Sequence, residues 1–256
     1  MWLVLGQHHD VEARWVAAEL GERADRPVTL VTDATLVHDC RWDVRVGAAR
    51  ARSRLVLGDG TVLDPTTVDA VVNRLSWLGA EAFGGASERD REYATGELHA
   101  LGLAWLESLG GRVVNRPAGN GLAGPWRRTS EWRTLARTVG LPVVAYDSDD
   151  PEAERLTFEP DDRVVLVLDG EVLDAGAGAG SGPGAGLPPA VREGLSALQR
   201  AAGLDLLEAR LSPRPDGDGD GWALRSASFL PALSRFGDVG LDALHKALIA
   251  RGGGGR

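Results

Sequence analysis

Residues 1–31 read MWLVLGQHHDVEARWVAAELGERADRPVTLV, and this stretch sets the fold class of the chain. Residues 2–5 and 27–31 are short apolar runs typical of buried strands, and residues 11–20 between them have the pattern of a helix. Asp10 stands directly before that helix, where its carboxylate can accept hydrogen bonds from the free N–H groups of the first turn. A strand, a helix and a second strand in this order predict a mostly parallel sheet with helices packed on its faces.

The same alternation continues through the first half of the chain. Asp59-Gly60 lies between two short apolar runs and is a strong hairpin signal. Further strands are predicted over 68–74 and 112–115, and the segment between them, 87–109, has the pattern of a long amphipathic helix with a serine cap. We therefore expect an α/β domain over residues 1–125.

After Pro125 the pattern becomes α+β, with antiparallel hairpins and helices. The predicted elements are a helix capped by Thr129 or Ser130, a segment over 141–144 that leads into a strand, a hairpin of 163–168 and 171–174, a helix opened by Pro188 and Pro189 that runs to Ala202, strands over 204–211 and 222–229, and a last helix over 241–250. We expect a second domain over 126–251, and disorder in the glycine-rich tail 252–256.

Composition excludes several classes of protein. The net charge of −9 argues against a nucleic-acid backbone as partner, because phosphates need a basic surface. Cys40 is the single cysteine, so neither an intrachain disulfide nor a cysteine metal cluster can form. The chain has no run of 18 apolar residues, and its N-terminal run lacks the flanks of a signal peptide. We expect a cytoplasmic protein that does not enter the membrane.

His8-His9-Asp10 follows the first predicted strand. Open α/β sheets place their ligand sites at this end of the strands, so these side chains could supply acid–base groups. The competing interpretation is that they are ordinary loop residues, since adjacent histidines point in different directions on a strand.

Two further motifs carry little weight as sites. Residues 216–221 read DGDGDG, like the first half of a calcium loop, but the twelfth position is Ala227 where a bidentate glutamate is needed. The glycines of 119–124 are spaced like a dinucleotide fingerprint but follow Pro117 and precede Pro125, which favours a plain loop. We expect no metal site and no bound cofactor.

A combination of short segments in a fixed order is more specific than any of these motifs. They are Val71-Val-Asn-Arg74, Arg112-Val-Val-Asn-Arg-Pro117, Val139-Gly-Leu-Pro-Val143, Ala202-Gly-Leu-Asp205 and Phe229-Leu-Pro231. This order resembles the ATP-grasp peptide ligases, in particular the relatives of ribosomal-protein glutamate ligase and of the enzymes that macrocyclise graspetides. The resemblance covers almost the whole chain. It implies a Rossmann-like pre-ATP-grasp domain over 1–125 and an α+β ATP-grasp domain over 126–251.

Two departures from the family pattern concern the binding of magnesium-ATP. Between Tyr146 and Arg163 the chain has only a short acidic segment, where the family has a subdomain whose lysines reach the phosphates. The resemblance therefore implies a truncated ATP-grasp domain. It also places Arg210 where the family has a metal-binding Asp, and Arg225-Ser226-Ala227 where the family has Glu-x-Asn. Magnesium needs oxygen ligands, and a guanidinium offers no acceptor atom.

These departures lead us to predict a pseudoenzyme that binds a partner protein, a peptide or a small molecule in a peptide or natural-product modification pathway. Arg210 and Arg225 could hold a carboxylate or phosphate, or each could pair with a nearby acid such as Glu208 or Asp220. Surface left bare by the lost subdomain would be covered by a homodimer contact or a partner chain.

The alternative is an enzyme of ATP-grasp carboxylate–amine ligase descent. It would either use metal-independent chemistry, with Arg74 joining the arginine-rich site and His8, His9 and Asp10 as acid–base groups, or act as a ligase only when a second chain supplies the missing subdomain.

Overall fold

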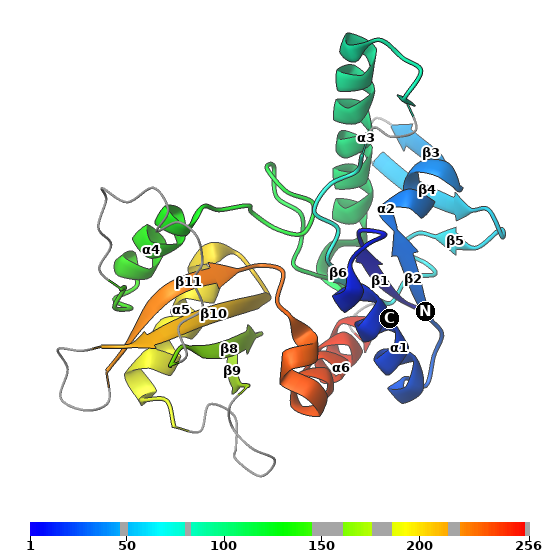
Figure 1. Cartoon of the computed structure of the whole chain (residues 1–256). Coiled ribbons are helices and arrows are strands. Elements are labelled where there is room, and N and C mark those ends of the chain that lie inside the picture. The colour runs from blue at the N-terminus through cyan, green and yellow to red at the C-terminus, as the bar shows by residue number, and fades with distance from the viewer. Residues whose placement is uncertain (47–50, 80–82, 145–160, 176–185, 215–220, 254–256) are drawn as a thin grey trace. The chain divides into compact units, whose positions relative to one another are not determined.

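The computed structural model describes residues 1–46, 51–79, 83–144, 161–175, 186–214 and 221–253. The chain divides into two compact units, which we describe separately. Unit 1 comprises Met1–Pro125 with Leu241–Arg256, and unit 2 comprises Trp126–Gly240 (Figure 1).

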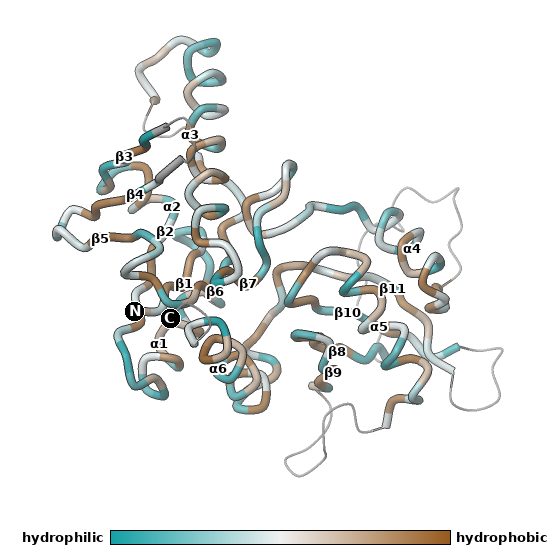
Figure 2. Tube along the Cα trace, turned by 180° about the vertical axis from the view of Figure 1, so that it is seen from behind, coloured by the Kyte–Doolittle hydropathy of each residue, from teal (hydrophilic) through white to brown (hydrophobic). Residues whose placement is uncertain are grey.

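A parallel sheet of four strands forms the centre of unit 1, as the sequence predicted. Its strands are β1 (Trp2–Gly6), β2 (Val28–Thr32), β6 (Ala70–Asn73) and β7 (Val113–Val114). They lie in the order β2-β1-β6-β7, and each pair of neighbours is parallel. All five residues of β1 are buried, because this strand is central and covered on both faces. In Figure 2 the tube is accordingly brown along β1.

Helices α1 and α3 of unit 1 begin at the predicted caps. Asp10 accepts hydrogen bonds from the backbone N–H groups of Glu12 and Ala13 at the start of α1 (Val11–Arg23). Ser87 likewise accepts from the N–H of Asp90 at the start of α3 (Glu88–Leu109). The buried residues of α3 all lie between Leu98 and Leu109, and its first turns are teal in Figure 2.

An antiparallel sheet of three strands, β3 (Cys40–Val46), β4 (Ala51–Leu57) and β5 (Val62–Leu63), also belongs to unit 1. The predicted hairpin turn at Asp59-Gly60 joins β4 to β5. Asp59 accepts a hydrogen bond from the N–H of Thr61 at 2.8 Å, and Gly60 has the positive φ of 86° that this turn requires. The sequence analysis predicted neither β3 nor the short helix α2 (Asp33–His38) before it.

Unit 2 is an antiparallel sheet covered on one face by two helices, α4 (Thr129–Thr138) and α5 (Pro189–Ala202). Its strands are β8 (Arg163–Leu168), β9 (Glu171–Asp174), β10 (Leu206–Pro213) and β11 (Trp222–Ser228), in the order β11-β10-β8-β9. The predicted hairpin of β8 and β9 is confirmed. Its turn residues Asp169 and Gly170 both have positive φ. Trp132, Leu198 and Leu207 belong to the core between helices and sheet.

Some predicted elements differ from the structure. Helix α4 begins after Arg128, whose N–H donates to the Glu131 carboxylate at 2.6 Å, so the predicted caps Thr129 and Ser130 lie inside the helix instead. The segment 141–144, which was expected to lead into a strand, forms one bridge from Val143 to Leu224, and the residues that follow it lie outside the described ranges.

The last helix, α6 (Gly237–Gly253), is longer than predicted and includes two residues of the tail that was expected to be disordered. The His245 ring of α6 packs edge-on against Trp2 in unit 1, with ring centroids 5.3 Å apart. The division of the chain into domains 1–125 and 126–251 stays a prediction. The rest of the tail, the acidic segment 147–154 and nearly all of 216–221 lie outside the described residues.

None of the described helices is both long enough and apolar enough to cross a bilayer.

Candidate functional site

Polar side chains gather where the parallel strands of unit 1 end. His8, His9 and Asp10 follow β1, Asp33 follows β2, and Arg74 follows β6. The carboxyl ends of parallel strands meet at the same edge of a sheet, which is why the structure brings these distant residues together. The sequence analysis identified four of the five and missed Asp33.

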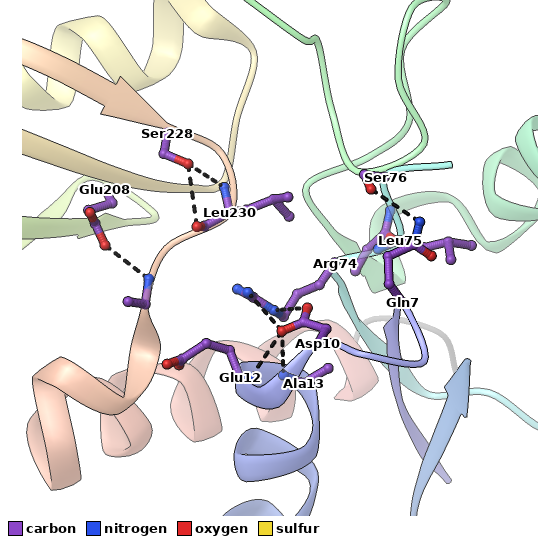
Figure 3. A network of polar contacts seen from close by, with 12 residues as sticks. Gln7, Asp10, Glu12, Ala13, Arg74, Leu75, Ser76, Glu208, Ser228 and Leu230 are labelled. Carbon is purple, nitrogen blue, oxygen red and sulfur yellow. Dashed lines mark hydrogen bonds and ion pairs between the residues drawn. The ribbon is translucent and has the colours of Figure 1, made fainter. Parts of the chain in front are cut away.

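Arg74 and Asp10 form a buried, two-pronged ion pair. The Arg74 Nε lies 2.9 Å from Asp10 Oδ2, and its Nη2 donates to Oδ1 at 3.3 Å (Figure 3). The two side chains are only 6% and 14% exposed. Since the same carboxylate also caps α1, Asp10 connects the first helix to the end of β6. We interpret this ion pair as structural, because the carboxylate and the guanidinium already bind each other.

His8 is held by a buried carboxylate. Its Nδ1 lies 3.2 Å from Asp33 Oδ2, and its backbone N–H donates to Asp33 Oδ1 at 2.5 Å. The Asp33 side chain is 6% exposed, whereas His8 is 61% exposed. A carboxylate at Nδ1 favours the tautomer that carries its proton there, which leaves Nε2 as an acceptor. The exposed His9 packs edge-on against His8, with ring centroids 5.0 Å apart.

Buried amides hold the same strand ends in place. Gln7 is 6% exposed and donates through Nε2 to Ser76 Oγ at 3.3 Å and to the Trp77 carbonyl at 3.1 Å (Figure 3). Asn73 donates to the carbonyls of Asn115 and Leu122, at 3.1 and 2.7 Å. Gln7 Oε1 is buried and has no hydrogen-bond partner among the described residues.

Arg210 in unit 2 lines a cavity of about 200 Å³ on one face of the sheet. The β10 residues Glu208 and Arg210 lie opposite the β11 residues Ser228 and Ser226, and all four line the cavity. Arg210 Nε is 3.5 Å from Glu208 Oε1, so Arg210 pairs with one of the two acids considered from the sequence. Glu208 also accepts a hydrogen bond from the Ala232 N–H at 2.9 Å (Figure 3).

Arg225 has a partner that the sequence did not indicate. The pairing of β10 with β11 shifts between Arg210 and Leu211, and Arg225 is the extra residue of this bulge. Its Nε lies 3.0 Å from Asp162 Oδ2 and donates to Ser212 Oγ at 2.7 Å. The side chain of Asp162 is fully buried, and Asp162 lies 63 residues before Arg225, so no local pattern connects the two residues. Asp220, the alternative partner, lies outside the described residues.

The donors around Arg210 and Arg225 do not fit a magnesium ion. Glu208 is the one carboxylate that lines the described cavity, and it already accepts from Ala232 and faces Arg210. Asp162 faces Arg225 and Ser212. Magnesium takes six oxygen ligands in near-octahedral geometry, and guanidinium groups supply none. No group of three or more histidine, cysteine or acidic side chains that could hold a metal occurs in the described ranges.

No protein-family model and no curated protein matches the sequence. Solved structures do match. The macrocyclase MdnC bound with precursor peptide MdnA, from Microcystis aeruginosa MRC, is 14% identical with a TM-score of 0.69, over 97% of this chain and 99% of that chain. The ATP-grasp ligase PsnB, complexed with precursor peptide PsnA2 and AMPPNP, is 17% identical with a TM-score of 0.65, over 98% and 97%.

A third match is the RiPP-associated ATP-grasp ligase of Chryseobacterium gregarium, in complex with ADP and a leader and core peptide. It is 11% identical with a TM-score of 0.67, over 96% of this chain and 94% of that chain. The likeness runs through both units and reaches nearly both ends of the chain. At low sequence identity, the chain thus has the fold of the ATP-grasp peptide ligases.

Proposed function

We propose that this protein is a catalytically degenerate ATP-grasp protein that binds a partner protein, a peptide or a small molecule and does not transfer phosphate from ATP. The observation that carries the proposal is that Arg210 and Arg225 are both paired with acids. The family resemblance assigns these two residues to the positions of metal ligands. Each guanidinium faces an acid within unit 2, Glu208 for Arg210 and Asp162 for Arg225.

Electrostatics supports this proposal. A divalent cation beside two guanidinium groups would be repelled by an energy on the order of several kcal/mol, even with the partial screening found near protein surfaces. Both nearby carboxylates already have cationic partners, so binding a metal would require those ion pairs to open. Opening the Arg225–Asp162 pair would remove the cation that compensates a fully buried carboxylate, which costs free energy.

We also propose that the ATP-grasp domain is truncated. The segment between Tyr146 and Arg163 has fewer than twenty residues. Chains below about 40 residues rarely build a core without disulfides or metals, so this segment is too short for an independent subdomain. The matches to MdnC and PsnB run almost end to end in both chains, so the proposal of a truncation rests on the length of this segment alone.

The class of partner is a proposal drawn from the relatives. The solved structures of MdnC, PsnB and the Chryseobacterium ligase each contain a peptide. A peptide is thus the first ligand to test. Of the two arginines considered as anion contacts, Arg210 is the better candidate, because it lines the cavity with Ser226 and Ser228 whereas Arg225 is held by a buried acid.

Thermal unfolding tests the proposal. A ligand that binds only the folded state raises the Tm, by an amount that grows with the ratio of ligand concentration to Kd. We expect millimolar ATP to leave the Tm unchanged with or without Mg²⁺. A Mg²⁺-dependent rise of several degrees would instead restore the ligase interpretation.

The pairing of His8 with Asp33 favours a second candidate function, an enzyme with metal-independent chemistry. An exposed imidazole oriented by a buried carboxylate is a suitable general base. Turnover of a carboxylated or phosphorylated substrate that is lost in His8→Gln but kept in His9→Gln would support this function.

A further inference from the structure

A second cavity in unit 2 lies away from Arg210 and Arg225. It has a volume of about 470 Å³ and is bordered by α5 and by the turn between β8 and β9. We call it the α5 groove. The lining residues that matter for its chemistry are Gly170, Glu171, Arg192, Glu193, Ser196 and Arg200.

The wall of the α5 groove is fixed by hydrogen bonds between the hairpin turn and the helix. Ser196 Oγ donates to the Gly170 carbonyl at 2.7 Å, and the Gly170 N–H donates to Gln199 Oε1 at 2.8 Å. Gln199 is 2% exposed, and its amide also donates to the Val167 carbonyl at 3.0 Å. The groove is therefore formed in advance of any ligand, which lowers the entropic cost of binding.

Two arginines border the groove on the same helix. Arg192 and Arg200 are eight residues apart, with Ser196 midway, so all three lie along one face of α5. The Arg192 Nε is buried and has no hydrogen-bond partner among the described residues. A buried donor without a partner costs about 1–3 kcal/mol, and no described residue offsets this cost for Arg192.

The two glutamates at the α5 groove do not remove the attraction of its arginines for an anion. Glu171 and Glu193 are exposed and therefore hydrated, so neither needs a ligand to satisfy it. None of the four charged side chains forms an ion pair within the described ranges. The groove therefore has a hydrogen-bond donor that lacks an acceptor. A carboxylate is a planar anion whose geometry matches that of a guanidinium.

We propose that the α5 groove is a carboxylate-binding site in which Arg192 and Arg200 hold the acidic group of an amino acid or of a peptide segment. The volume admits a carboxylate together with the chain that carries it. Glu171 and Glu193 then disfavour ligands with several negative charges. This site does not depend on the nucleotide question, because it shares no residue with the cavity at Arg210.

Titrations of the full chain, followed by backbone amide NMR, test the site. The probes are L-glutamate for a free metabolite, the dipeptide acetyl-Glu-Ala-amide for a peptide side chain, and glutamine as the uncharged control. We expect signals of the groove residues to shift with a carboxylate probe and not with glutamine. Tighter binding of the dipeptide would identify a peptide ligand, and tighter binding of glutamate a metabolite.

Three variants make the test specific. Arg192→Gln should weaken the binding of the carboxylate about tenfold or more, since a hydrogen bond to a charged group is lost. Arg200→Gln should also weaken it, and because Arg200 is exposed this change leaves the fold intact. Arg137→Gln is the matched control on the exposed face of α4 and should bind like the original chain. Unchanged affinity in both groove variants, or no binding at millimolar probe, would overturn the proposal.

Discussion

The Arg225 guanidinium lies 3.0 Å from the carboxylate of Asp162, a side chain that solvent does not reach at all. A buried carboxylate of this kind is stable only when its charge is compensated. Arg225 therefore neutralises a buried acid of its own unit.

The first prediction concerns this pair. Arg225→Ala should reduce the free energy of unfolding by about 3–5 kcal/mol, because it leaves a buried charge without a partner. Urea unfolding measures the change. Arg137→Ala, at an exposed position of α4, should change it by less than about 0.5 kcal/mol. A loss no larger than that of the control would mean that Asp162 does not need Arg225.

Substitution of Asp10 should reduce the free energy of unfolding by more than substitution of an ordinary helix cap. Asp10→Asn keeps an acceptor for the N–H groups of Glu12 and Ala13 but removes the charge that faces Arg74. Asp10→Ala removes both, so its cost should exceed that of the Asn variant by about 1 kcal/mol, the usual value of a cap. Denaturant unfolding of both variants provides the comparison. Equal stability of the two would show that the cap contributes nothing.

The sequence predicted those parts of the fold that rest on local chemistry. The turn at Asp169-Gly170 fixed the β8–β9 hairpin, and Pro189 and Gly203 bracket α5, with Gly203 in the left-handed conformation that ends it. Apolar runs that alternate with helical segments predicted the parallel sheet of unit 1, because a strand in a parallel sheet is buried on both faces.

The remaining features depend on contacts between distant residues. Nothing near Asp33 or Asp162 shows that each will face a basic side chain more than twenty residues away. The bulge at Arg225 is also invisible in the sequence, although it decides which side chain reaches Ser212. For this reason the sequence identified Arg210 and Arg225 as candidates but could not assign both of their partners.

Cys40 should be a slow nucleophile. Burial raises the pKa of its thiol to about 11, against about 8.5 for a free cysteine. At pH 8 the reactive thiolate is thus scarce, and alkylation by iodoacetamide should be much slower than in the urea-unfolded chain. A rate equal to that of the unfolded chain would contradict this.

The same shift has a consequence for stability. Because the folded-state pKa is raised, ionisation favours the unfolded chain. The contribution of Cys40 is therefore complete below about pH 8.5 and is lost as the pH rises towards 11. Unfolding of Cys40→Ser over this range should show a smaller fall in stability than that of the original chain. Parallel curves would count against a buried thiol.

Association is a further prediction. We expect light scattering to give the mass of a homodimer, or a monomer that forms a complex with a partner chain, because the proposed truncation would leave apolar surface uncovered. A chain that stays monomeric at all concentrations and binds no partner would argue against the truncation.

Calorimetric titration of ATP into the protein, with and without Mg²⁺, tests the central claim most directly. The pairing of Arg210 with Glu208 and of Arg225 with Asp162 predicts no binding heat at millimolar nucleotide in either buffer. Saturable, Mg²⁺-dependent heat would contradict this account and would mean that the chain retains the metal–nucleotide site of a ligase.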